Sequence, residues 1–211
     1  AYEIVSRDWS SDVCSSDLAL LDLGDLDKLM AMTDPEHKRQ LMQTIGEILG
    51  EAAGDDGIAG RLGDGRFGVV AAKPIDEQAL ARDLTDATAK AVPKAPPLTA
   101  KAVTIALETS GLSRADAGRA VLYAVQRFTQ AQVSVDGIAA LGRGLPALLA
   151  DAAGAVAKLR EIIRERRINL ALQPIRLLDS LKVHHYEAFC RLPDNSDPGP
   201  VIAAAEQAAL A

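Results

Sequence analysis

Apolar and polar positions along the first part of the chain alternate in a way that predicts strands and helices in turn. Residues 19–22 form a short apolar run that ends in an acid, and they predict a buried strand. Residues 36–51 place leucine and isoleucine at helical spacing and predict an amphipathic helix. Residues 58–72 alternate apolar residues with glycines around a tight turn, and this pattern predicts a hairpin.

The alternation of helix and strand patterns continues to about residue 130. Residues 76–91 predict a second helix, which ends before a cluster of prolines, and residues 102–108 predict a strand. A third helix is expected to begin at Ser113, because Asp116 stands three residues later as a capping partner. Strands that alternate with helices indicate the α/β class, with a central sheet and flanking helices.

A second group of elements follows a glycine-containing connection at residues 132–144. A long helix is expected next, and its apolar residues recur at alternating spacings of four and three, as in a heptad seam: Leu145, Leu149, Ala152, Val156, Leu159 and Ile163. We interpret it as a connecting helix that packs on its own domains. A signalling helix that pairs in a homodimer through residues 145–167 is the alternative.

The last part of the chain carries two further strand patterns, at residues 169–175 and 183–192. A turn at residues 178–180 joins them, and an alanine-rich helix is expected at residues 201–210. The patterns divide the chain into four segments: a leader at 1–18, a first domain at 19–130, a linker and connecting helix at 131–168, and a last segment at 169–211.

Composition and charge exclude several classes of protein. Hydrophobic residues make up 48% of the chain, which is enough for a core, whereas aromatic residues make up only 3%. The net charge of −6 argues against a nucleic-acid-binding protein. No apolar run in the sequence is long enough to span a bilayer, and no signal peptide is recognisable. Cys14 and Cys190 are the two cysteines and fit a reducing compartment, so we expect a cytoplasmic protein.

The leader contains an unusual run of residues. Residues 7–18 read RDWSSDVCSSDL, which resembles the translation of a common short-read sequencing adapter. On this interpretation Trp9 and Cys14 have no biological role, and residues 1–18 are an artefactual or disordered leader. A genuine loop rich in serine and aspartate is the alternative.

A ten-residue run in the predicted hairpin, RLGDGRFGVV from Arg61 to Val70, carries a first family resemblance. It resembles the R-x-G-G-(D/E)-E-F motif and the following strand of GGDEF domains, which have the diguanylate cyclase fold. The five central positions of the motif are held by Gly63, Asp64, Gly65, Arg66 and Phe67. The resemblance implies a nucleotide-cyclase-type sheet for residues 19–130.

Several positions depart from the pattern of that family. Aligned on the motif, Asp22 falls on the family's first metal-binding aspartate, whereas Gly65 and Arg66 stand at motif positions that are acidic in the family. Because Arg66 would repel a divalent cation, we expect a degenerate domain without diguanylate cyclase activity, in which Asp22 is a vestigial metal position. The alternatives are a plain structural hairpin, a site that still binds GTP through Arg66 and Lys73, and an unusual but active cyclase.

Three short motifs in the last segment carry a second resemblance. They are QPI at Gln173, EAFCR from Glu187 to Arg191, and P-x-I-x-x-A-E at residues 200–206. In this order they resemble the opening of an EAL domain, a (β/α) barrel that hydrolyses cyclic di-GMP. The resemblance implies Mg²⁺ or Mn²⁺ as cofactor, Glu187 as a metal ligand, Gln173 near the ligand, and Arg191 on a phosphate.

Each of these residues also has a plainer interpretation. Glu187 is the kind of carboxylate that stands exposed on many strands, and Arg191 has Asp194 nearby as an ion-pair partner. His184 and His185 precede the motif, but neighbouring strand residues point to opposite faces. We therefore interpret the two histidines as residues of the sheet surface and not as metal ligands.

The sequence as a whole predicts a piece of a bacterial cyclic-di-GMP signalling protein. The remaining metal ligands and barrel strands of the EAL family are expected beyond Ala211, so no complete catalytic site is expected within the chain. The parent protein is expected to be a metal-dependent phosphodiesterase with an inactive GGDEF-like regulatory domain. The rivals are a non-catalytic receptor or scaffold for cyclic di-GMP or GTP, and an unrelated α/β domain.

Overall fold

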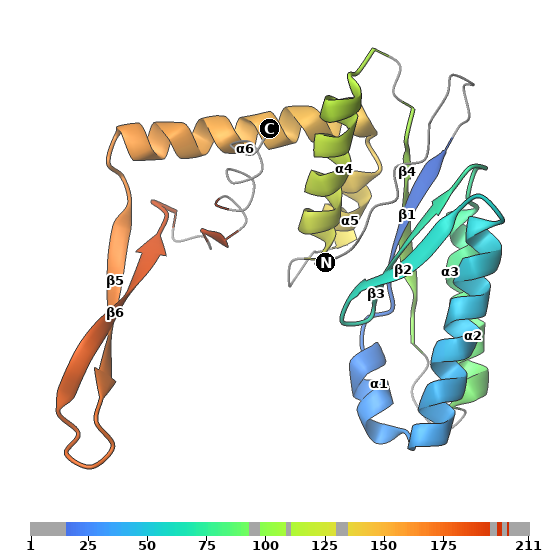
Figure 1. The fold of residues 1–211 in the computed structure, drawn as a ribbon, viewed down its shortest axis with the longest axis horizontal. Helices are drawn as coiled ribbons and strands as arrows, with labels where there is room; N and C mark the ends of the chain where they lie inside the picture. Colours follow the sequence, from blue (N-terminus) through green and yellow to red (C-terminus); the bar gives the residue numbers. More distant parts are fainter. Residues whose placement is uncertain are drawn as a thin grey trace. The chain divides into compact units, whose positions relative to one another are not determined.

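The computed structural model of the chain describes residues 16–92, 98–108, 111–129, 135–194, 198, 199 and 202 (Figure 1). It divides into two compact units, one of residues 1–110 with 137–144 and the other of residues 111–136 with 145–211. Helices and antiparallel strands make up the described parts, so the chain is a mixed α and β protein. Within these parts, no helix combines the length and the apolar character that crossing a membrane requires.

A four-stranded antiparallel sheet forms the centre of the first unit. Its strands lie in the order β2-β3-β1-β4 and span Ile58–Gly63, Arg66–Ala71, Asp17–Asp22 and Lys101–Ala106. The hairpin predicted at 58–72 and the strands predicted at 19–22 and 102–108 are confirmed. Strand β1 begins two residues earlier than expected, within the run that resembles a sequencing adapter. Residues 1–15 lie outside the described part, so the origin of that run stays a prediction.

Two long helices cover one face of this sheet (Figure 1). They are α2 (Pro35–Ala53) and α3 (Glu77–Ala91), and they confirm the helices predicted at 36–51 and 76–91. Two short helices, α1 (Leu26–Met32) and α5 (Val135–Leu141), have no counterpart in the prediction. The connection expected at 132–144 is therefore wrong over α5. A helix of seven residues has too few turns for its apolar spacing to stand out in a sequence.

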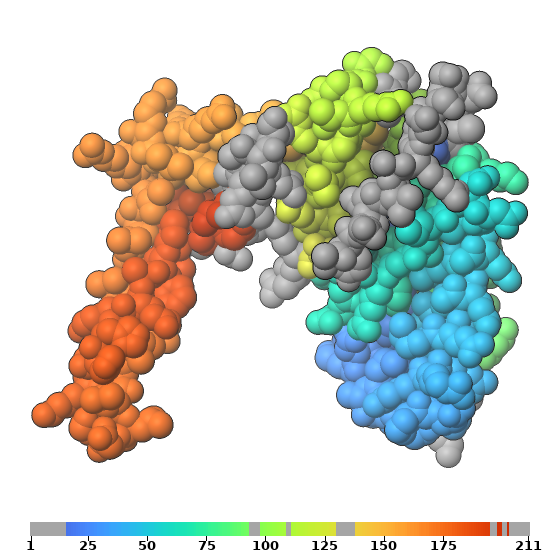
Figure 2. Space-filling view, in the orientation of Figure 1, coloured from blue at the N-terminus to red at the C-terminus, as the bar shows by residue number. Residues whose placement is uncertain are grey.

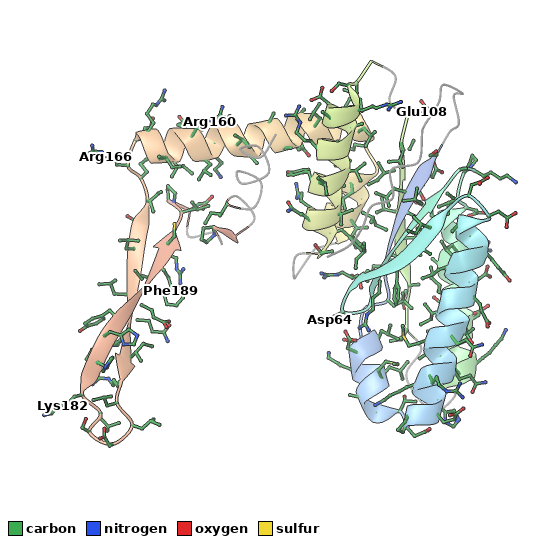
Figure 3. The ribbon with its side chains drawn as sticks, in the orientation of Figure 1. Asp64, Glu108, Arg160, Arg166, Lys182 and Phe189 are labelled. Carbon is green, nitrogen blue, oxygen red and sulfur yellow. The ribbon has the colours of Figure 1, made fainter. Side chains whose placement is uncertain are left out.

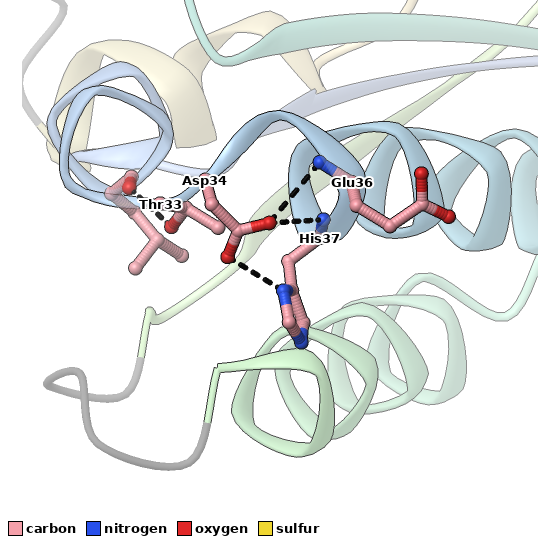
Figure 4. A network of polar contacts seen from close by, with 5 residues as sticks. Thr33, Asp34, Glu36 and His37 are labelled. Atoms are coloured by element: carbon pink, nitrogen blue, oxygen red, sulfur yellow. Dashed lines mark hydrogen bonds and ion pairs between the residues drawn. The ribbon is translucent and has the colours of Figure 1, made fainter.

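Aspartate side chains cap the starts of both long helices. The Asp34 Oδ1 accepts hydrogen bonds from the backbone N–H groups of Glu36 and His37, at 3.1 and 3.2 Å (Figure 4). The Asp76 Oδ1 accepts hydrogen bonds from the backbone N–H groups of Gln78 and Ala79 in α3, at 3.0 and 2.9 Å. The first N–H groups of a helix have no partner within the helix, so each cap satisfies donors that would otherwise be unpaired.

The core of the first unit lies between the sheet and the pair α2 and α3. Register pairs place Ala19 opposite Val69 and Leu21 opposite Phe67, so these four side chains share one sheet face. Buried residues of the two helices pack against them: Leu41, Ile45, Leu49, Leu80 and Leu84. Their spacing of three and four residues is the amphipathic pattern that predicted the helices.

The opposite face of the sheet is also buried at its centre. Leu20 pairs with Val103 in the register of β1 and β4, and both side chains are buried. Gly142, just beyond α5, lies against this face, because a Cβ added to it would stand 3.2 Å from a methyl carbon of Val103. Burial on both faces explains why β1 reads as a continuous apolar run, whereas a half-buried strand alternates between apolar and polar residues.

Two helices make up the larger part of the second unit. They are α4 (Arg114–Thr129) and α6 (Leu145–Arg164), and they pack on each other. At the start of α4, the Ser113 Oγ accepts a hydrogen bond from the Asp116 N–H at 3.1 Å and donates to the Asp116 carboxylate at 2.7 Å. The predicted cap is therefore confirmed. The hydrogen bond from the Ser113 hydroxyl is the main cause that lowers the pKa of Asp116 below its ordinary value of 3.8.

The apolar seam expected on α6 is wrong at its C-terminal end. Ile162 is 2% exposed, whereas Ile163, the last residue of the expected seam, is 55% exposed. Near the start of the helix Leu145 and Leu148 are buried, while Leu149 is only half-buried. The buried stripe therefore runs one position before the expected seam at both places. Spacings of four and three residues define a line of apolar positions along one face of a helix. In this alanine-rich helix several neighbouring lines have that spacing, so the sequence does not select one of them.

A two-stranded antiparallel hairpin of β5 (Asn169–Arg176) and β6 (Val183–Arg191) completes the described part of the second unit. It confirms the strands predicted at 169–175 and 183–192. Most of its side chains are exposed, and they form the outer surface of this segment in Figure 2. The described residues show no closed barrel. The helix expected at 201–210 lies outside the described residues except at one position.

Candidate functional site

The GGDEF-like motif lies at the turn between β2 and β3. Gly63 ends β2, Asp64 and Gly65 form the turn, and Arg66 begins β3; Asp64 is labelled in Figure 3. Phe67 follows with its side chain 3% exposed and belongs to the core. The five motif positions therefore combine a tight turn with a strand that is anchored by a buried aromatic ring.

The turn is tied to the end of the central strand β1. The backbone N–H of Leu23 donates a hydrogen bond to the carbonyl of Gly65 at 2.8 Å. Gly65 has a φ of 64°, and a Cβ on it would stand 3.2 Å from the carbonyl oxygen of Gly24. Left-handed backbone and close approach both favour glycine at position 65. The residue that removes the motif's acid is therefore also the residue that fits this turn.

Asp22, which the sequence analysis interprets as a vestigial metal position, lies between two cationic residues in the sheet register. It pairs with Arg66 of β3 on one side and with Lys101 of β4 on the other. Directly opposed residues of antiparallel strands project from the same face, so the three side chains share a surface. The Asp22 Oδ1 accepts a hydrogen bond from the Gly24 N–H at 2.7 Å, and the Oδ2 lies 3.9 Å from the Arg66 Nε.

A cavity of about 260 Å³ opens beside this carboxylate. Six residues line it: Asp22, Gly24, Asp25, Leu98, Thr99 and Lys101. Asp25 forms an ion pair with Lys28 at 2.8 Å, and the hydrogen bond between them is the main cause that raises the pKa of Lys28. Acidic groups at this end of the sheet are thus matched by cations of the same chain.

The donor set around Asp22 does not fit a divalent cation. Mg²⁺ and Mn²⁺ take several oxygen ligands, most often carboxylates. Here the Asp22 carboxylate lies beside a guanidinium and has a backbone N–H on its other oxygen, while Asp25, the second carboxylate of the cavity, forms an ion pair with Lys28. Among the residues that the structure describes, no group of three or more His, Cys, Asp or Glu side chains is placed to hold a metal.

The EAL-like motif lies on the β5–β6 hairpin, where the register brings two of its residues together. Gln173 of β5 stands directly opposite Glu187 of β6. Arg191 lies four residues along the same strand as Glu187 and therefore projects from the same face. The three residues that the sequence singled out thus share one face of the hairpin. Their roles toward a ligand stay predictions.

Arg191 is oriented by its own strand. Its guanidinium carbon lies 5.7 Å from the centre of the Phe189 ring, and its Nη1 donates to the Cys190 carbonyl at 2.9 Å. Phe189, labelled in Figure 3, is 37% exposed. The carboxylate of Asp194, considered above as a partner of Arg191, forms an ion pair with Lys158 of α6 at 3.2 Å.

His184 and His185 differ from the expectation in one respect. Both are exposed, as residues of a sheet surface should be, but they do not diverge: their Nδ1 atoms lie 2.8 Å apart. The register shifts here, because Ile175 pairs with His185 while the next residue of β5 pairs with Val183. His184 is therefore the extra residue of a β-bulge. A bulge breaks the strict alternation of faces and so brings the two rings together.

Glu187 and Gln173 supply oxygen atoms of the kind that Mg²⁺ prefers, on one exposed face. They provide part of a ligand set. Further carboxylates are needed to hold a hydrated divalent cation in a fixed geometry, and the described residues gather no cluster of three or more ligating side chains. A metal at Glu187 therefore stays a proposal.

No pattern in the sequence indicates Lys101 as a neighbour of Asp22. Lys101 directly precedes the apolar run that predicted the strand at 102–108, and it begins strand β4. Its place opposite Asp22 depends on the strand order and on the antiparallel register. No local pattern in the chain carries that information.

Comparisons with known proteins find similarity among solved structures. No family model matches the chain, and a search of curated proteins gives no significant match. Among solved structures, it is similar to Vibrio cholerae LapD, an S helix-GGDEF-EAL protein bound to c-di-GMP, with a TM-score of 0.38 and 12% sequence identity. The match covers 92% of this chain and 47% of that one, so the chain spans about half of its length. A TM-score below 0.5 does not establish a shared fold.

Proposed function

We propose that the chain is part of a cyclic-di-GMP signalling protein, and that its β5–β6 hairpin contributes to a metal-dependent phosphodiesterase site of the EAL type. The observation that supports this proposal is the register pair of Gln173 and Glu187, with Arg191 on the same face. A carboxylate, an amide and a guanidinium are the groups that a metal-assisted phosphodiesterase needs near its substrate. The short motifs around these residues point to the same family.

Each side chain has a distinct part in this proposal. Mg²⁺ or Mn²⁺, when bound, supplies an activated water and offsets the charge of the phosphate. Glu187 contributes a carboxylate ligand to the metal, while Arg191 donates charge-assisted hydrogen bonds to a phosphate oxygen. Gln173, directly across the strands, positions the ligand through its amide. The remaining carboxylates come from outside this hairpin.

The first unit has a regulatory role in this proposal, without cyclase activity. A diguanylate cyclase must hold a nucleoside triphosphate and its metal ions at the motif turn. Here Gly65 and Arg66 stand at the acidic positions, and Arg66 lies beside Asp22. Incubation with GTP and Mg²⁺ should therefore give no cyclic di-GMP. Formation of the dinucleotide would show that the first unit is an active cyclase.

The phosphodiesterase is tested with the protein as its gene encodes it. The protein is incubated with cyclic di-GMP and Mn²⁺, and the linear dinucleotide is measured by chromatography. Glu187→Gln should lower the rate on the order of a hundredfold or more, because a ligand of the metal is lost. Glu161→Gln, which removes an exposed carboxylate of α6, is the matched control and should leave the rate unchanged.

Binding separates the two functional classes. Isothermal titration with cyclic di-GMP should show that Arg191→Ala weakens binding, because the contact to the phosphate is lost. Glu187→Gln, titrated with Ca²⁺ in place of Mn²⁺, should still bind the dinucleotide, because Arg191 is unchanged. Binding without hydrolysis in the unaltered protein would favour the receptor or scaffold over the enzyme. Absence of both binding and hydrolysis would rule out a cyclic-di-GMP site at this hairpin.

A further inference from the structure

We propose that Arg66 acts as a permanent cation for the Asp22 carboxylate, so that this end of the first sheet assembles without a divalent metal ion and excludes one. The inference concerns the end of the paired strands β1 and β3 in the first unit, and it does not depend on the phosphodiesterase proposed for the β5–β6 hairpin. It assigns Arg66 a defined electrostatic role that the loss of an acidic motif residue alone does not imply.

The register places Arg66 beside Asp22. Arg66 is the register partner of Asp22, so the two side chains project side by side from the same face of neighbouring strands. The Arg66 Nε lies 3.9 Å from the Asp22 Oδ2. That separation is too long for a hydrogen bond but short for an electrostatic interaction between unit charges. The guanidinium thus lies close to one oxygen of the carboxylate, where its positive charge opposes that of a metal ion bound to the same oxygen.

Both members of this ion pair are largely shielded from water. The side chains of Asp22 and Arg66 are only 20% and 17% exposed. Water screens such a pair less than it screens an ion pair on an open surface. An arginine keeps its charge at any pH at which the protein is folded. A divalent cation that approached Asp22 would therefore meet a weakly screened positive charge that cannot be removed by deprotonation.

The second carboxylate oxygen of Asp22 also has a partner within the chain. The Gly24 N–H donates to Oδ1 at 2.7 Å, and Lys101 is the register partner on β4. The Gly24 N–H and the Arg66 guanidinium thus approach different oxygens of the carboxylate, and the register places a second cationic residue on the same sheet face. The β1 end is also held to the motif turn by the hydrogen bond from Leu23 to Gly65. The partners of Asp22 and of the motif turn are thus supplied by the chain itself.

Titration with Mn²⁺ tests the inference on the full 211-residue chain. Paramagnetic Mn²⁺ broadens the amide signals of residues near its site, so the Leu23 and Gly24 amides report on Asp22 in ¹⁵N-labelled protein. The unaltered protein should show no selective broadening of these two signals. Arg66→Glu should produce it and raise the apparent Mn²⁺ affinity on the order of tenfold or more, since a cation is replaced by a second carboxylate. The double variant Asp22→Asn with Arg66→Glu should lose it again.

Two further variants keep the test decisive. Arg82→Glu makes the same change of charge on the exposed surface of α3 and should leave the Leu23 and Gly24 signals sharp. If two adjacent carboxylates prevent Arg66→Glu from folding, as seen by circular dichroism, Arg66→Gln removes the cation with little change of shape and should give weaker selective broadening.

Two results would overturn the inference. Selective broadening in the unaltered protein that Asp22→Asn abolishes would show that Asp22 binds the metal despite Arg66. Folded Arg66→Glu or Arg66→Gln protein without broadening would show that Arg66 is not what excludes the ion. Neither result bears on hydrolysis at Glu187, so the two proposals fail independently.

Discussion

The β2–β3 and β5–β6 hairpins carry the two motif resemblances and have the same local topology, but they differ in what surrounds them. Strand β3 pairs with β1 as well as with β2, and Phe67 on it is 3% exposed. Strands β5 and β6 pair only with each other within the described residues, and Phe189 on β6 is 37% exposed. Leu170, Leu172 and Tyr186 of the second hairpin are more exposed still.

This difference shows that two hairpins with the same local pattern can differ in how much stability they gain from burial. The first hairpin is part of a core and gains stability from burial of apolar surface. The second is a two-stranded ribbon, and such a ribbon is marginally stable in water without packing of one face. The GGDEF-like motif, which departs further from its family pattern, therefore lies on the hairpin that packs into a core. The EAL-like motif lies on the more exposed hairpin.

A matched pair of truncations is expected to give the largest effect. Phe67→Ala should lower the free energy of unfolding of the first unit by about 3–5 kcal/mol, because it removes a buried ring and leaves a cavity. Phe189→Ala should cost the second hairpin less than about 1.5 kcal/mol, since its ring is partly in water. Amide hydrogen exchange measured on α2 and on β6 separates the two units. Equal costs would mean that the second hairpin is packed as firmly as the first.

A glycine pair sharpens the comparison within the first hairpin. Gly65→Ala should destabilise the first unit by about 1–3 kcal/mol, because residue 65 has positive φ and its Cβ would crowd the Gly24 carbonyl. Gly60→Ala in β2 is the control, since nothing lies within 4 Å of its added Cβ and its φ is ordinary. We expect it to be neutral or stabilising by up to about 1 kcal/mol. Urea unfolding followed by circular dichroism measures both, and a neutral Gly65→Ala would contradict the geometry of the turn.

A helix cap gives a smaller effect on the same unit. Asp76→Ala should cost about 1 kcal/mol of stability, because it leaves two N–H groups at the start of α3 without their acceptor. Asp83→Ala removes an exposed carboxylate further along the same helix and should change stability by less than about 0.5 kcal/mol. Thermal unfolding compares the two variants. The cap assignment is wrong if they shift the midpoint equally.

The smallest effect concerns pH and the start of α2 (Figure 4). The hydrogen bond from the His37 backbone N–H is the main cause that lowers the pKa of Asp34 below its ordinary value of 3.8. A carboxyl whose folded pKa is depressed stabilises the protein above its unfolded pKa, and this contribution is lost as pH falls through the folded pKa. Asp34→Asn keeps a capping oxygen but does not titrate, so it should flatten the stability profile below pH 3.8.

An NMR titration checks this prediction directly. The carboxyl carbon of Asp34 should show a midpoint below that of an aspartate in an unfolded peptide, and His37→Ala should raise it only partly, because the backbone donor remains. A midpoint at or above the peptide value would contradict the cap.

The helices and strands of the first unit could be predicted from sequence where the apolar pattern was long or regular. Helix α2 repeats its apolar positions over five turns, and the run around Gly65 combines a turn with alternating residues. Helices α1 and α5 escaped prediction because one or two turns carry too few positions. On α6 the frequent alanines allowed several apolar stripes, and burial selected a stripe next to the expected one.

In the candidate sites, too, some features could be predicted from the sequence and others required the structure. The motifs located Gln173, Glu187 and Arg191, and strand periodicity alone places Glu187 and Arg191 on one face. That Gln173 stands opposite Glu187 required the hairpin register, and that His184 approaches His185 required the bulge. The pairing of Asp22 with Arg66 and Lys101 joins three strands that are far apart in the chain.

Local patterns were sufficient to predict the longer helices and strands and the turn at Gly65, because these features depend on neighbours within a few positions. Tertiary structure alone decided the strand order, the burial of Phe67 against the exposure of Phe189, and the cations that flank Asp22. Those features depend on which distant segments meet, and the free energy of such contacts comes from burial and charge proximity that no local run of residues contains.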